Sequence, residues 1–134
     1  MRQPVLLTGA ALGFLSVAIG ASAEHLLQAR VTDEVFRWVM TAIRYHQVGA
    51  LVITGIGLTL LSPLPSARAA RLQRAAWAFI AGTLLFSFSI YLAALSGVEA
   101  LTKLTPLGGL TLMLGWLLLL IAALPVADDR STSG

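Results

Sequence analysis

Four long stretches without a charged side chain dominate this chain. They cover residues 3–23, 45–67, 75–98 and 104–127, and they are 21, 23, 24 and 24 residues long. An α-helix rises ~1.5 Å per residue, so roughly 20 apolar residues cross the ~30 Å hydrocarbon core of a bilayer. The sequence therefore predicts an all-α integral membrane protein. We expect a four-helix bundle whose spans cover residues 4–23, 45–62, 75–97 and 105–125.

The composition is that of a membrane protein and excludes several kinds of site. Of the 134 residues, 57% are hydrophobic and 11% are charged, which is far from the usual balance of a soluble domain. We therefore expect one membrane domain over residues 1–134, with the lipid bilayer as its main partner. Cysteine is absent, which excludes disulfides, thiolate metal ligands and cysteine nucleophiles. The basic residues are scattered through short loops, so no nucleic-acid surface is expected.

The longest polar connection, residues 24–44, has a helical pattern of its own. Thr32 can cap a helix whose first turn holds Asp33 and Glu34, which the positive end of a helix dipole favours. Apolar side chains then recur near helical spacing, at Val35, Phe36, Val39, Met40 and Ile43. The pattern predicts an amphipathic helix over residues 33–44 that lies at the membrane interface and leads into the second span.

The connection between spans two and three sets the predicted topology. Two prolines end span two, and three arginines spaced three residues apart follow, at Arg68, Arg71 and Arg74. On a helix these side chains share one face, which predicts a lipid-facing basic anchor beside the membrane. With four spans, the termini lie on the side of this loop, which carries five basic residues against four on the other. The positive-inside rule therefore predicts that both termini are cytoplasmic.

The two ends of the chain carry further predictions. Ala21, Ser22 and Ala23 form a small-residue site that would suit cleavage of residues 1–23 as a signal peptide, the alternative to a first span. At the other end, residues 128–134 are small and polar, which predicts a disordered tail.

Small residues at helical spacing predict where the spans touch. Lipid is as apolar as leucine, so helices in a bilayer associate through close backbone approach and hydrogen bonds. The predicted packing glycines are Gly9, Gly13, Gly82, Gly97, Gly108, Gly109 and Gly115.

The same argument predicts hydrogen bonds between the last two spans. If spans three and four are antiparallel about Leu101, Trp116 lies level with Ser87 and Tyr91 with Thr111. We predict hydrogen bonds within these two pairs, because unsatisfied polar groups in a bilayer cost several kcal/mol. The alternative is that serine and threonine bond to their own helix backbones.

Four polar residues near the ends of spans one and two form the candidate site. Glu24 and His25 close span one, and Tyr45 and His46 open span two, so both histidines are expected near the same membrane face. They could form a proton site, because histidine titrates near neutral pH, or act as interfacial residues that bond to helix ends and lipid head groups. Two histidines and a carboxylate can also hold a divalent metal, but the spacing matches no H-x-x-x-H or E-x-x-H pattern. We expect no metal and no cofactor.

Several segments resemble one family in the same order. Residues 20–25 (GASAEH) resemble the GAFGAH motif that ends the first span of the Domain of Unknown Function 423 family, the YgdD-like small inner-membrane proteins related to eukaryotic transmembrane protein 256. Residues 41–45 (TAIRY) resemble its TAxRY, residues 86–91 (FSFSIY) its FSGSLY and residues 105–109 (TPLGG) its TPxGG, with Trp116 following as in the family. The resemblance implies four spans and a plasma-membrane address, and it supplies no activity.

Three positions depart from the family pattern. Glu24 stands beside His25 where the family has alanine. The histidine of the family's YQMYHAL is Gly49 here, and His46 appears one helical turn earlier on the same face. The FSGSLY glycine is Phe88. The chain therefore resembles a divergent member.

Two functions follow from these observations. The first is a non-enzymatic accessory or interaction component that packs against a second copy or a larger membrane complex, which the small-residue faces favour. The alternative is an oligomeric small-solute or proton-coupled transporter or channel that uses Glu24, His25 and His46. An enzyme is not expected, because no nucleophile, base and orienting group come together in the sequence.

Overall fold

The computed structural model describes residues 3–126, which are helical and contain no strand. The all-α prediction is confirmed for this part of the chain, and the predicted disorder of residues 128–134 lies outside it. The elements are α1 (Gln3–Ser22), the π-helical turn η1 (Ala23–Leu27), α2 (Asp33–Thr59), α3 (Ser66–Thr83), the π-helical turn η2 (Leu84–Phe88), α4 (Ser89–Ser96), the 3-10 helix η3 (Glu99–Leu104) and α5 (Thr105–Ala123).

Three helical segments in the described residues are long and apolar enough to cross a membrane. They are Gln3–Leu27, Ser66–Ser96 and Glu99–Ala123, by length and composition. The helix α2 is not among them; it carries two acidic and two basic side chains before Tyr45, at Asp33, Glu34, Arg37 and Arg44, and His46 and Gln47 follow.

The helix α2 differs from the predicted pair of an interfacial helix and a separate span. Thr32 caps it as expected, with its hydroxyl accepting a hydrogen bond from the Val35 N–H at 3.3 Å. The helix then continues past Tyr45 to Thr59 without a break. Neither glycine nor proline interrupts it before Gly49, and one buried face runs through both predicted parts. Residues 33–44 are thus the first part of one long helix that packs against the rest of the molecule with one face.

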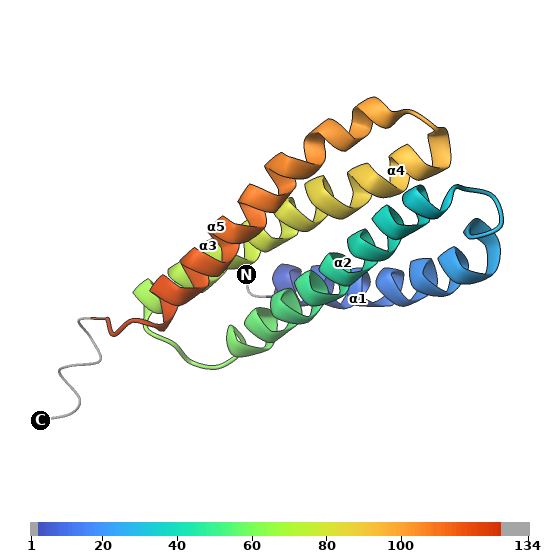
Figure 1. Cartoon of the computed structure of the whole chain (residues 1–134). Coiled ribbons are helices and arrows are strands. Elements are labelled where there is room, and N and C mark those ends of the chain that lie inside the picture. The colour runs from blue at the N-terminus through green and yellow to red at the C-terminus, as the bar shows by residue number, and fades with distance from the viewer. Residues whose placement is uncertain (1–2, 127–134) are drawn as a thin grey trace, which may run out of the picture.

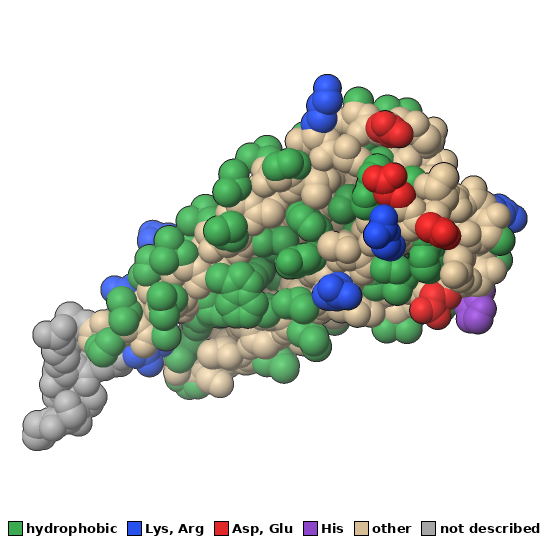
Figure 2. All heavy atoms as spheres, viewed as in Figure 1, with side chains coloured by type: hydrophobic (Ala, Val, Ile, Leu, Met, Phe, Trp, Pro, Cys, Tyr) green, Lys and Arg blue, Asp and Glu red, His purple; other side chains and the backbone are tan. Residues whose placement is uncertain are grey.

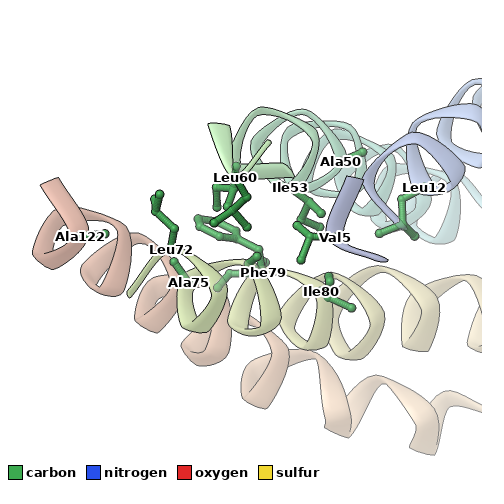
Figure 3. Close-up of a cluster of buried hydrophobic side chains, with 13 residues drawn as sticks. Val5, Leu12, Ala50, Ile53, Leu60, Leu72, Ala75, Phe79, Ile80 and Ala122 are labelled. Atoms are coloured by element: carbon green, nitrogen blue, oxygen red, sulfur yellow. The ribbon is translucent and has the colours of Figure 1, made fainter. Parts of the chain in front are cut away.

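The helices form two antiparallel hairpins (Figure 1). In the first hairpin α1 packs along α2; in the second α5 packs along α3 and η2, and η3 packs against α4. The hairpins meet mainly where α2 contacts α3, η2 and α4. Figure 3 shows one core cluster at this junction, where Phe79 of α3 lies among Ile53 of α2, Leu60 just after α2 and Val5 of α1.

Glycines mark the closest contacts within each hairpin. A Cβ added to Gly9 would lie 2.6 Å from the Thr54 backbone nitrogen, and one added to Gly57 would lie 2.6 Å from the Leu6 Cα. In the second hairpin Gly108 lies against the Phe86 backbone, and a Cβ on Gly82 would lie 2.8 Å from the Leu112 nitrogen. Helices can approach this closely only where one of them lacks a side chain.

The remaining predicted packing glycines do not all make such contacts. A Cβ on Gly115 would lie 3.1 Å from the Phe79 ring, and one on Gly109 would lie at an ordinary 3.7 Å from the Phe86 ring. No neighbour lies within 4 Å of the corresponding position at Gly13. Gly97 also has none, and its φ of 72° ends α4 in the left-handed conformation that glycine adopts at helix C-termini.

The second hairpin turns at Gly97 and not at Leu101. Contacting residues of its two arms lie equally far from Gly97, namely Ser89 with Thr105, Phe86 with Gly108, Gly82 with Leu112 and Phe79 with Gly115. The reason is that η3 already runs back along α4 before α5 begins. The chain therefore reverses four residues earlier than the predicted centre at Leu101.

Candidate functional site

The structure does not bring the four predicted polar residues together. Glu24 and His25 lie on η1 and are exposed. Tyr45 is about half exposed, at 46%, whereas His46 has no exposed surface. His46 is thus the only one of these side chains enclosed by the protein.

The two histidines also lie at different positions along the axis of the first hairpin. In the first hairpin Gly9 contacts Thr54, Leu6 contacts Gly57 and Gly20 lies beside Ile43, so α1 and α2 pair about the point between residues 31 and 32. In this register His46 lies eight residues further along α2 than the α2 position opposite His25. At ~1.5 Å per residue the difference is roughly 12 Å. His46 is also the central residue of α2.

His46 is held by aromatic residues of the second hairpin. Its Nδ1 lies 3.1 Å from the Tyr91 hydroxyl in a buried hydrogen bond whose donor is set by the histidine tautomer. The Phe88 ring lies 5.3 Å from the imidazole and 5.4 Å from the Tyr91 ring, measured between centroids. The second nitrogen, Nε2, is buried and makes no hydrogen bond to a described residue.

Two hydroxyls extend this buried polar contact along the junction of the hairpins. The Ser87 hydroxyl donates to the Ala42 carbonyl at 2.7 Å, and the Thr83 hydroxyl lies against Gly49. We call His46, Thr83, Ser87 and Tyr91 the polar seam. Three members of the polar seam are spaced four residues apart: Thr83 just before the π-helical turn η2, Ser87 within it and Tyr91 after it. Each of these side chains faces α2. Sequence reasoning missed Thr83 and Gly49, although Gly49 shares a helix face with His46.

The predicted hydrogen-bond pairs between spans three and four are wrong. Tyr91 bonds to His46 and Ser87 to Ala42, while the Thr111 hydroxyl donates to the Leu107 carbonyl of its own helix at 2.8 Å. Trp116 is half exposed and packs edge-to-face on Phe79, with ring centroids 5.1 Å apart. Because the turn is centred on Gly97, the side chains that meet across this hairpin are Ser89 and Thr105, whose hydroxyls lie 2.9 Å apart.

A surface groove runs between α2 and α5, which belong to different hairpins. Its volume is about 240 Å³, and it is lined by Tyr45, Val48, Gly49, Phe79, Phe86, Gly109, Leu112, Met113 and Trp116. A second hollow, of about 340 Å³, lies beside Val52 and Leu119. Neither is lined by Glu24, His25 or His46. Within residues 3–126 no three His, Asp or Glu side chains gather in a way that could hold a metal ion.

On the face shown in Figure 2, most charged side chains lie toward the two ends, and apolar side chains cover much of the middle. The predicted basic anchor lies on the first turns of α3, where Arg74 is exposed and Arg68 is partly buried. Arg71 has a structural contact that the sequence did not reveal. Its Nη1 donates to the carbonyls of Ile121 and Leu124, at 3.3 and 3.4 Å, and so caps the C-terminal end of α5.

Replacing Arg71 by Gln should therefore loosen the end of α5. A cation at a helix C-terminus contributes about 0.3–1 kcal/mol, and the last carbonyls would lose a donor. We expect faster amide hydrogen exchange in the last turn of α5, with the rest of the helix unchanged. Arg74→Gln is the matched control, and equal exchange in both variants would contradict the capping role.

Comparison with known proteins gives a consistent result over most of the chain. The family model described as "Protein of unknown function (DUF423)" matches residues 19–109. The chain is 31% identical to the UPF0382 inner membrane protein YgdD of Escherichia coli (strain K12) over 126 residues, 90% of this chain and 88% of that protein. It is 29% identical to the UPF0382 membrane protein YwdK of Bacillus subtilis (strain 168) over 120 residues, 88% of this chain and 94% of the relative. No solved structure matches.

These relatives and the three apolar helical segments together describe a small multi-pass membrane protein. The matched region extends from the end of α1 to the first turns of α5 and contains the whole polar seam. The chain belongs to the DUF423 family of membrane proteins.

Proposed function

We propose that this protein is a non-enzymatic accessory or interaction component of the bacterial plasma membrane, with four spans and both termini in the cytoplasm. Support for α2 as the fourth span comes from its length and packing. Its 27 residues extend about 40 Å, more than the ~30 Å core requires, and it lies along the apolar helix α1. Its charged residues all fall in the half that precedes Tyr45.

The observation that carries the accessory role is the closure of the protein around His46. Helix contacts at Gly9, Gly57 and Gly108 are tight, and the imidazole is covered by Phe88 and Tyr91. Glu24 and His25 lie outside this enclosure. The outer faces of the helices are apolar, with large exposed side chains such as Leu110 and Met113. Such faces suit contact with lipid or with another membrane helix.

Affinity purification of the tagged full chain in mild detergent tests this role. A partner recovered in fixed stoichiometry, with an intact mass that retains residues 1–23, would support an accessory component. A chain recovered alone at every detergent concentration would count against it. Loss of the first 23 residues would overturn the four-span topology.

One observation favours the alternative of a proton-coupled transporter. His46 is buried within α2, the proposed second span, and an ionisable residue inside a membrane segment indicates a functional site by default. Proteoliposomes with an internal pH dye and a potassium diffusion potential would test this. Proton flux in the wild type that disappears in His46→Gln would support transport, and equal flux in protein-free liposomes would exclude proton conduction.

A further inference from the structure

The groove between α2 and α5 has the features of a lipid site, a role beyond the proposed accessory function. We propose that it binds one acyl chain of an anionic phospholipid whose phosphate is held by Arg44. The acyl chain would lie between Tyr45 and Trp116, and the head group would lie beyond the Tyr45 end.

One glycine and four aromatic rings shape the groove. Gly109 of α5 contributes no side chain, so the space above the Phe86 ring stays open. The Tyr45 ring packs on Phe86, with centroids 4.8 Å apart, and the Trp116 ring packs edge-to-face on Phe79. Tyr45 and Trp116 are 46% and 50% exposed and border the groove as walls. These contacts hold the walls in place.

The lining of the groove suits hydrocarbon. On α5 the groove extends from Gly109 to Trp116, which is about 10 Å at ~1.5 Å per residue. Its side chains are apolar apart from the Tyr45 hydroxyl and the Trp116 N–H, so an acyl chain can lie along it without leaving a polar group unpaired.

Arg44 supplies the charge at one end of the groove. It is exposed, and it precedes the groove residue Val48 by four positions, so both side chains lie on the same face of α2. Arg37 lies further along this face and has Asp33 four residues before it, whereas no acidic residue lies three or four positions from Arg44. An arginine beside an apolar groove can bind a lipid phosphate while its stem covers apolar surface.

Native mass spectrometry of the full chain in mild detergent tests the proposal. The protein is mixed with phosphatidylglycerol or with phosphatidylcholine of the same acyl chains. We expect one phosphatidylglycerol retained per chain under conditions that remove phosphatidylcholine. Arg44→Gln should weaken this retention about fivefold, the equivalent of ~1 kcal/mol for one basic residue. Val48→Trp, which fills the groove from an exposed position, should abolish it.

Two variants serve as matched controls. Arg30→Gln removes an exposed arginine distant in sequence from the groove, and Leu51→Trp adds the same bulk at a 74% exposed position that does not line it. Both should retain phosphatidylglycerol like the wild type. Equal retention of the two lipids, or equal loss in Val48→Trp and Leu51→Trp, would overturn the proposal. A lipid-free dimer that only Val48→Trp dissociates would show that a second copy occupies the groove.

Discussion

Replacing Gly108 by Ala should lower the free energy of unfolding by about 1–3 kcal/mol, the usual effect of overfilling a packed contact. Gly108 lies against the backbone of Phe86, so an added methyl group has no flexible side chain to displace. Either α5 must move away from η2 or the backbone must distort. Both changes would also disturb the neighbouring contact between Gly82 and Leu112.

The matched control is Gly13→Ala, because no atom lies within 4 Å of the position that its methyl group would occupy. Alanine is a better helix former than glycine by roughly 0.5–1 kcal/mol, so this variant should be as stable as the wild type or slightly more stable. Reversible unfolding in mixed micelles, followed by circular dichroism, compares the two variants. Similar stabilities for both would show that α5 and η2 are not in close contact.

His46→Leu should lower the free energy of unfolding by about 1–3 kcal/mol, the usual range for a buried polar group that loses its partner. Leucine keeps much of the packing volume, but it leaves the Tyr91 hydroxyl buried without the imidazole nitrogen that lies 3.1 Å away. Tyr91→Phe leaves Nδ1 of His46 without its partner and should be destabilising for the same reason.

A double-mutant cycle separates this hydrogen bond from general packing. The variant with both substitutions removes both polar groups, so it should be less destabilised than the sum of the single variants by about 1 kcal/mol. The three variants and the wild type are compared by unfolding in the same micelles. Strictly additive losses would mean that His46 and Tyr91 do not interact.

Much of the helical architecture can be predicted from the sequence because charge marks where helices can lie. The uncharged run at residues 3–23 corresponds to α1, and the run at residues 104–127 contains α5. The start of α2 was also predictable, since Thr32 and the acidic residues after it form a capping pattern. The continuity of α2 past Tyr45 was not predictable. The pattern changes there from amphipathic to apolar, and this change looks the same whether or not the helix bends.

The candidate site was less predictable, for a geometric reason. His46, Ser87 and Tyr91 could be identified as polar residues in apolar surroundings, but their partners depend on how the helices are aligned. That alignment is set in part by Gly97, after which η3 runs back along α4. It is also set by the extra residue per turn in η2. Neither feature leaves a periodic signal. An error of four residues in the position of the turn placed Tyr91 level with Thr111, and the sequence did not reveal that Tyr91 faces His46 of the other hairpin.

The division into two hairpins has a consequence for how the protein is made. The tightest contacts of α1 and α2, at Gly9 and Gly57, lie wholly within the part of the chain that leaves the ribosome first. If α2 spans the membrane as proposed, this hairpin can enter the bilayer and pack before α5 has been synthesised. His46 would then face lipid until the second hairpin brings Phe88 and Tyr91 to it. On the proposed topology the imidazole would give the late hairpin a polar group to bond, so that a hydrogen bond as well as shape would direct the final step of assembly.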